Sequence, residues 1–209
     1  MDTIDRYFPD ITSVQRSNFL KLKVLYEEQN AKINVISRKD MESFYLHHVL
    51  HSLTITAFVN WNSKCRLLDL GTGGGFPAIP LAIYYPEIQF TAIDGTGKKI
   101  KVLTEIAEQL GLKNLKAMHL RAEDCKEKFH FIVSRAVCSL DQLIQYSKPL
   151  LLRDAVTALP NGVLSYKGGD LTEEIREIKK KAYFETYDIH QKFPEAYFQE
   201  KKLVYLQLH

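Results

Sequence analysis

Apolar residues recur at two different spacings along this chain, and the spacings predict helices first and then strands and helices in alternation. Over residues 13–33 and again over 40–59, apolar positions fall three or four apart, which indicates two helices separated by a polar break. Thr12 or Ser13 can cap the first helix, and Asp40 can cap the second. These two helices precede the first strand, so we expect them to form an N-terminal cap.

Beyond the cap, short apolar runs of strand length alternate with helical stretches. Predicted strands cover residues 66–70, 89–94, 115–120, 129–134, 162–166, 184–192 and 201–208, and predicted helices cover 76–85, 98–110, 140–152 and 171–182. The last two strands flank a loop with Pro194 and are expected to pair antiparallel. This alternation predicts an α/β fold with a mostly parallel seven-stranded sheet, helices on both faces and an antiparallel last strand.

The segment RLLDLGTGGGFPAIP joins the first of these strands to its helix through a glycine-rich turn. Glycines at Gly71, Gly73 and Gly75 permit a tight turn and a close approach of backbone to a ligand. A dinucleotide-binding fingerprint would place its third glycine where Phe76 stands. Asp69, two residues before the turn, suits a positively charged ligand better than a pyrophosphate. The pattern D-x-G-x-G-x-G resembles the S-adenosylmethionine loop of Rossmann-like class I methyltransferases, whose ligand carries an ammonium group.

The carboxyl ends of the predicted strands carry charged residues of both signs, and ligands of open parallel sheets bind at those ends. Asp94 ends the second strand at the distance expected for a ribose contact, which we favour over a plain turn residue. Asp69 and Asp94 suit a cationic cofactor that contains a ribose. Arg135 and Lys167 end later strands and suit an acceptor-rich substrate such as nucleic acid.

Each charged candidate also has a plainer interpretation. Arg135 ends a very apolar strand, where a charge is costly unless it lies at the edge of a site. The alternative for Arg135 is a structural ion pair with Asp69 or Asp94. Glu123 follows the third strand and is predicted equally well as an adenine neighbour or as a surface acid.

The basic residues outside the strands are candidates for RNA contacts. Lys98 and Lys99 open a helix and can bind phosphates, although a solvated helix face explains them too, and for Lys101 that explanation is preferred. Lys167 stands in a Lys-Gly-Gly turn, where the glycines leave room for a substrate. His48 lies on the second helix, where a lone histidine more often packs than binds.

Composition excludes several classes of protein. The 209 residues are 45% hydrophobic and 25% charged, which fits one globular domain. A net charge of +3 permits a nucleic-acid partner without requiring one. Three cysteines without C-x-x-C spacing argue against a zinc site, no metal is expected, and Cys138 has no neighbouring His or acid that would make it a nucleophile. The start MDTIDRYFPD is not a signal peptide and no run approaches membrane-spanning length, so we expect a soluble, cytoplasmic monomer without membrane contacts.

From about Leu25 to the last strand, the chain resembles the ribosomal RNA small subunit methyltransferase G family, also called glucose-inhibited division protein B. The supporting segments are Asn30 with NVIS, HVLHS, DLGTGGGFPAIP, Asp94 with two lysines, SRA after the fourth strand, and Lys167-Gly168. The string G-T-G-x-G-x-P-x-I-P and the SRA triplet are specific to that family. The chain departs from the family pattern at Gln29, His51 and Ala78.

The resemblance implies transfer of a methyl group from S-adenosylmethionine to N7 of a guanine in the 530 loop of 16S rRNA, within the small ribosomal subunit or an assembly intermediate. It also implies one domain, with the cap at residues 1–62 and the Rossmann-like core at 63–209. Guanine N7 has a lone pair and no proton to lose, so no general base is required.

Carried over by position, the resemblance assigns roles to individual residues. Cofactor contacts fall on Gly71, Phe76, Ala122, Glu123 and Arg135, beside the loop residues Asp69, Gly73 and Gly75 and the strand end Asp94. Arg135 and Lys167 are the candidates for holding the guanine, and RNA contacts are expected from Lys98, Lys99, Arg135, Lys167 and His48. The competing hypotheses are a small-molecule methyltransferase, a non-catalytic module that binds the cofactor or RNA, and, less favoured, an NAD-dependent oxidoreductase.

Overall fold

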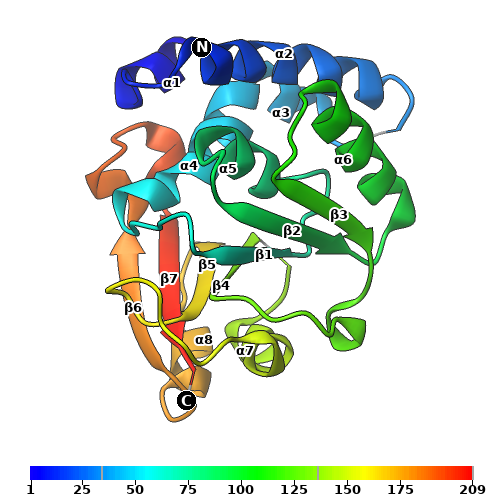
Figure 1. Ribbon diagram of the computed structural model, residues 1–209. Coiled ribbons are helices and arrows are strands. Elements are labelled where there is room, and N and C mark those ends of the chain that lie inside the picture. Colours follow the sequence, from blue (N-terminus) through cyan, green and yellow to red (C-terminus); the bar gives the residue numbers. More distant parts are fainter. Residues whose placement is uncertain (34, 136, 209) are drawn as a thin grey trace.

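The computed structural model describes residues 1–33, 35–135 and 137–208, and its centre is a seven-stranded sheet (Figure 1). Its strands are β1 (Arg66–Leu70), β2 (Gln89–Asp94), β3 (Leu115–His119), β4 (Phe131–Arg135), β5 (Gly162–Gly168), β6 (Tyr183–Asp188) and β7 (Lys201–Gln207). They lie in the order β3-β2-β1-β4-β5-β7-β6. Strands β1 to β5 pair in parallel, and β7 runs antiparallel to both of its neighbours. The mostly parallel α/β sheet with an antiparallel last strand is therefore confirmed.

Helices cover both faces of the sheet, which explains why its central strands are apolar almost throughout. The α-helices are α1 (Asp2–Tyr7), α2 (Ser13–Asn30), α3 (Arg38–Glu42), α4 (His51–Leu53), α5 (Ala78–Tyr84), α6 (Gly97–Gln109), α7 (Leu140–Ser147) and α8 (Thr172–Ile178). Figure 1 shows α2, α5 and α6 on one side of the sheet and α7 and α8 on the other. Neighbouring residues of β1 point to opposite sides, so Leu67 joins the cluster under α2 and α5, and Leu68 joins the one under α7 and α8.

Helix α2 starts after Thr12, as its capping residue predicts, and ends at Asn30, before the predicted end at residue 33. The Thr12 hydroxyl accepts a hydrogen bond from the Gln15 N–H, and the Gln15 side chain returns to the Thr12 backbone. At the other end, the Asn30 side chain accepts from the N–H groups of Val35 and Ile36 and donates to the Ile36 carbonyl. Asn30 therefore closes the turn that leads out of the helix.

The prediction of one continuous helix over residues 40–59, capped by Asp40, is wrong. Ser37 is the cap, because its hydroxyl accepts from the Asp40 N–H at 3.1 Å, and α3 is followed by a π-helical turn, η1 (Tyr45–Leu50), then α4 and a 3-10 turn, η2 (Thr54–Ala57). Hydroxyl groups bind backbone carbonyls in this segment, with Ser52 bonded to His48 and Thr54 bonded to His51. Such bonds compete with regular α-helical pairing and change its pitch.

The short helix α1 was not predicted, because six residues are too few to show a helical period. Its Ile4 is fully buried in the same cluster as α2 and the sheet. Among the helices of the described ranges, none is long and apolar enough to cross a membrane.

Candidate functional site

The glycine-rich turn between β1 and α5 forms the floor of the site. Gly71, Gly73 and Gly75 have φ values of +73°, +59° and +111°, a region that favours glycine. A Cβ on Gly71 would lie 2.4 Å from a methyl carbon of Val137, and one on Gly75 would lie 2.7 Å from Ile79. Backbone angle and space thus both require glycine at these two positions.

Two hollows lie above this turn and together form what we call the cofactor cleft. The first has a volume of about 420 Å³, and its lining includes the predicted site residues His48, Gly71, Gly73, Phe76, Asp94, Lys99 and Arg135. The second, of about 240 Å³, shares Gly71, Asp94 and Val137 with the first and adds Ala122 and Glu123. The structure therefore gathers most predicted cofactor residues around two adjacent hollows at the carboxyl ends of the strands.

Asp69 lies beneath the turn and is fully buried. Its Oδ2 accepts a hydrogen bond from the Ala78 N–H at 2.9 Å, which ties β1 to the start of α5. Burial raises the pKa of Asp69 to about 7, and the positive charge of Arg135 acts in the opposite direction. Oδ1 and the Thr72 hydroxyl are buried without a standard hydrogen bond among the described residues. Asp69 therefore supports the turn from beneath the cleft.

Asp94 holds the turn from the end of β2. Its Oδ2 accepts from the Gly73 N–H at 2.9 Å, and its Oδ1 accepts from the Thr96 N–H at 2.8 Å. Each oxygen keeps a second lone pair, and the residue lines both hollows of the cleft. The carboxylate is thus fixed in orientation and still able to accept hydrogen bonds from ligand hydroxyls.

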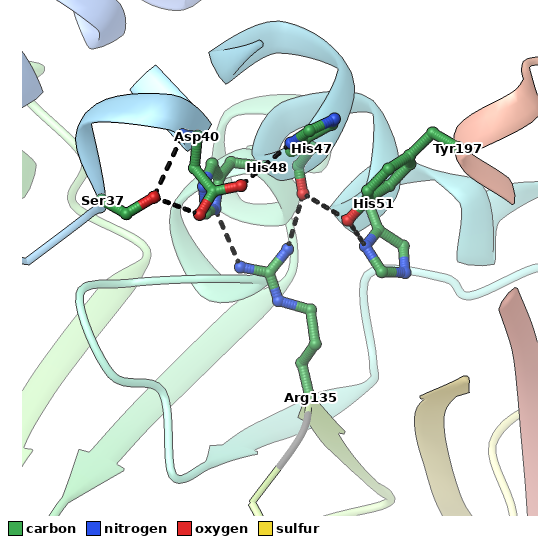
Figure 2. A network of polar contacts seen from close by, with 7 residues as sticks. All are labelled: Ser37, Asp40, His47, His48, His51, Arg135 and Tyr197. Atoms are coloured by element: carbon green, nitrogen blue, oxygen red, sulfur yellow. Dashed lines mark hydrogen bonds and ion pairs between the residues drawn. The ribbon is translucent and has the colours of Figure 1, made fainter. Parts of the chain in front are cut away.

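Arg135 bridges the end of β4 to the N-terminal cap (Figure 2). Its guanidinium donates to the His47 carbonyl at 3.2 Å and to His48 Nδ1 at 3.1 Å, and lies 5.3 Å from the centre of the Phe76 ring. These two donors of Arg135 therefore bind the cap, and they do not form the alternative ion pair with Asp69 or Asp94.

The bond from Arg135 fixes the protonation of His48. A guanidinium only donates, so His48 Nδ1 must accept and the ring proton lies on Nε2. Burial lowers the pKa of His48 to about 3, and the charge of Arg135 adds to the effect. Nε2 is buried without a hydrogen-bond partner among the described residues.

The same network continues across the cap to the 3-10 turn η6 (Ala196–Phe198). Asp40 bonds to Ser37 and to His47 Nδ1, and these bonds lower the pKa of Asp40. The His47 ring stacks on Tyr197 with 4.1 Å between centroids, and the Tyr197 hydroxyl lies 3.2 Å from His51 Nδ1 (Figure 2). Three separate parts of the chain thereby position the guanidinium of Arg135.

A neighbouring cavity of about 390 Å³, which we call the β5 cavity, adjoins the cleft at Arg135 and Val137. Lys167 lies in its wall and is only 10% exposed. The Lys167 ammonium donates to Glu174 Oε2 and to the Cys138 carbonyl, both at 2.7 Å. Lys167 is therefore a held, largely buried group. Lys98 and Lys99 are exposed on α6, and Lys99 reaches the cleft.

The sequence analysis missed three residues that shape the cleft. The Tyr26 hydroxyl, from α2, donates to the Gly74 carbonyl, and its ring packs 4.9 Å from Phe76. Val35 and Val137 line the cleft from the cap and from beyond β4. No local motif marks these residues, because each is brought to the glycine turn by packing between distant segments.

The sheet order, the glycine turn after β1 and the acid ending β2 define a class I methyltransferase fold. Solved structures share it: an S-adenosylmethionine-dependent methyltransferase from Aquifex aeolicus matches with a TM-score of 0.59 and 15% identity over 79% of this chain and 93% of its own. A ribosomal protein L11 methylase from Lactobacillus delbrueckii matches with a TM-score of 0.56 and 17% identity, over 77% of each chain.

The chain belongs to the rRNA small subunit methyltransferase G family, whose model matches residues 15–204. A relative in Phocaeicola vulgatus, named ribosomal RNA small subunit methyltransferase G, is 48% identical over 99% of this chain and 98% of its own. One of the same name in Porphyromonas gingivalis is 50% identical over 99% of this chain and 93% of its own. The family resemblance predicted from the motifs is confirmed.

Proposed function

We propose that this protein transfers a methyl group from S-adenosylmethionine to N7 of a guanine in the 530 loop of 16S rRNA. The observation that carries the proposal is that the cofactor cleft and the β5 cavity lie side by side and share Arg135 and Val137 in their linings. A methyl donor in the cleft would there meet a base entering from the second cavity. Membership of an rRNA methyltransferase family supports RNA as the acceptor. The protein would act in the cytoplasm, as a monomer, on the small subunit or an assembly intermediate.

The cleft offers what S-adenosylmethionine requires. Asp69 supplies negative charge beneath the turn for the cationic methionine end, and Asp94 supplies acceptors for the ribose hydroxyls. The hollow lined by Ala122 and Glu123 suits the adenine. The Nε2–H of His48 is a buried donor without a hydrogen-bond partner among the described residues. The chemistry of these residues fits the charge and the hydrogen-bonding groups of the cofactor.

The proposed chemistry does not require a general acid or a general base. When bound, S-adenosylmethionine supplies an activated methyl group, which the N7 lone pair accepts as the bond to sulfur breaks, leaving S-adenosylhomocysteine. No proton leaves the guanine, so the protein has to position the base and exclude water. Arg135 has donors beyond the two used by the cap, and they can hold the guanine O6 or a flanking phosphate. Lys99, exposed at the cleft, can bind phosphate.

The test is methyl transfer from labelled S-adenosylmethionine to small subunits from a strain that lacks this gene, followed by mapping of the modified nucleotide. We expect one 7-methylguanine, in the 530 loop. If the protein binds the cofactor but labels no subunit, the proposal fails in favour of a small-molecule methyltransferase or a non-catalytic module. If it binds no cofactor, the assignment of the cleft fails too.

A further inference from the structure

The β5 cavity contains an ion pair that the proposed methyl transfer does not by itself require. Lys167, on β5, and Glu174, on α8, lie 2.7 Å apart in its wall, with side chains 10% and 31% exposed. The cavity and the cofactor cleft share Arg135 and Val137 in their linings. A group bound between the ion pair and the cleft would therefore have one edge on the pair and the other on the methyl donor.

The described hydrogen bonds of Lys167 and Glu174 leave one acceptor oxygen and one donor available for a ligand. Glu174 Oε2 accepts from the Lys167 ammonium and from the Leu140 N–H, both at 2.7 Å. Oε1 receives no hydrogen bond from the residues that the structure describes. The Lys167 ammonium has three donors, and its described partners are Glu174 and the Cys138 carbonyl. The pair thus presents an acceptor oxygen and a donor side by side, in fixed positions.

Guanine carries the complementary groups in the right order. Its Watson–Crick edge presents two donors, N1–H and the N2 amino group, next to the acceptor O6. Adenine presents an acceptor at N1, which a carboxylate repels. Guanine N7 lies on the opposite side of the ring from N1 and N2. A guanine that binds Glu174 and Lys167 by its Watson–Crick edge therefore directs N7 back toward Arg135 and the cofactor cleft.

We propose that the β5 cavity is a guanine-recognition pocket, in which Glu174 Oε1 accepts from N1–H and the N2 amino group while Lys167 donates to O6. The base has to be unpaired and turned out of its stack to offer this edge, as enzymes that modify bases require. The inference rests on the proposed function for the identity of the substrate. It adds the groups that select guanine and orient its N7.

A purely structural role for Glu174 makes a different prediction. Glu174 accepts the Leu140 N–H at the start of α7, so its loss would also disturb that helix. Glu173 provides a matched control, because it precedes Glu174 on the same helix, is 71% exposed and pairs with Arg176 on the surface. The two positions allow the same substitution to be made inside and outside the cavity.

The first experiment compares Glu174→Gln with Glu173→Gln in methyl transfer to small subunits from the strain lacking the gene. We expect Glu174→Gln to lower kcat/KM by about 10- to 100-fold, the range for losing a paired base contact, and Glu173→Gln to stay within about twofold of wild type. Affinity for S-adenosylhomocysteine, measured by calorimetry, should be unchanged in both. Equal kcat/KM values for the two variants would overturn the proposal.

A second substrate separates recognition from folding. Subunits reconstituted with inosine at the target position lack only the N2 amino group, so wild type should lose about tenfold in kcat/KM, and Glu174→Gln should lose little more on inosine than on guanine. If the kcat/KM losses from inosine and from Glu174→Gln multiply, Glu174 acts through α7 and does not contact the N2 amino group, and the proposed pocket would be wrong.

Failure of the proposed function is recognised separately. If wild type methylates no subunit, binding of GMP and AMP to the complex with S-adenosylhomocysteine is compared by NMR. A preference for GMP that Glu174→Gln abolishes would support the pocket without the rRNA reaction. Equal binding of the two nucleotides would refute the pocket.

Discussion

Asp69 illustrates what a motif reveals about a single residue and what it leaves out. The sequence pattern placed an acid two residues before the glycine turn and predicted that it acts on a cationic ligand. In the structure that carboxyl group is fully buried, bonded to the Ala78 N–H and outside the lining of the cleft. Spacing along a strand gives the order of residues but not their depth. The expected direct contact therefore becomes an expected action through charge, which can be tested.

The raised pKa of Asp69 predicts a pH dependence of stability. The pKa is about 3.9 in an unfolded chain and about 7 in the folded protein, where burial disfavours the charge. Between these values the folded state binds more protons, so the stability contributed by this group falls as pH rises through that window. Asparagine cannot ionise. We expect the melting temperature of Asp69→Asn, without cofactor, to fall less than that of wild type from about pH 4.5 to about pH 7.

Cofactor binding should lower the raised pKa of Asp69 and so favour its ionised form. A cation above the turn favours the ionised carboxylate, as Arg135 does, whereas Asp94 opposes it. Wild type should therefore release protons on binding S-adenosylmethionine near pH 7, and Asp69→Asn should release fewer. Calorimetry in buffers of different ionisation enthalpy measures this number. Identical proton release by the two proteins would show that Asp69 is already ionised before the cofactor binds.

At the scale of elements, α2 holds the glycine turn in place. The Tyr26 hydroxyl donates to the Gly74 carbonyl, and its ring packs against both Phe44 and Phe76. Tyr26→Phe keeps the ring and removes the bond, which is worth about 1 kcal/mol. We expect the affinity for S-adenosylhomocysteine to fall about fivefold, as measured by calorimetry.

Tyr45→Phe is the control for this prediction. The Tyr45 hydroxyl also donates to a backbone carbonyl in the cap, that of Phe19 at 3.2 Å, but it does not touch the turn. Its removal should change stability without changing cofactor affinity. An equal loss of affinity in both variants would mean that the cap acts on the cleft as a whole rather than through Tyr26.

The elements themselves were largely predictable, and the failures have local causes. Each predicted strand exists, because strands buried on both faces are continuous apolar runs. The helix predicted over residues 98–110 also exists as α6, and Gly111 follows its end with φ of +67°. The single helix predicted over residues 40–59 is instead a series of α, π and 3-10 turns, because the hydroxyls of Ser52 and Thr54 bind the helix backbone. Within the site, the sequence identified the residues that belong to one motif. It did not identify Tyr26, because packing of another element against the glycine turn brings this residue to the site and no sequence spacing encodes that packing.

At the scale of the whole molecule, the cap and the sheet share one hydrophobic cluster. Ile4 and Phe19 from the cap are buried together with Leu67 and Leu164 from the sheet. The boundary expected near residue 62 therefore separates two parts of one core, and we propose that the chain unfolds as a single domain.

Trp61 provides the measurement for this proposal. It is the one tryptophan of the sequence, is 4% exposed and lies between the cap and β1. Unfolding followed by Trp61 fluorescence and by far-ultraviolet circular dichroism should give coincident transitions. S-adenosylhomocysteine at about 100 times its Kd should stabilise the whole transition by about 2.7 kcal/mol. Two separated transitions, with only one shifted by the ligand, would show that the cap folds independently.

The position of β7 has a consequence for how the protein is made. This strand lies between β5 and β6, and in the described sheet it is the one neighbour of β6. It is also the last of the seven described strands along the chain, so β6 has no partner and β5 has an open edge while residues 201–207 are still inside the ribosome. The sheet, and the β5 cavity that Lys201 helps to line, can close only after these residues emerge. The site that we propose for the substrate base is thus among the last parts of the sheet to form as the chain is made.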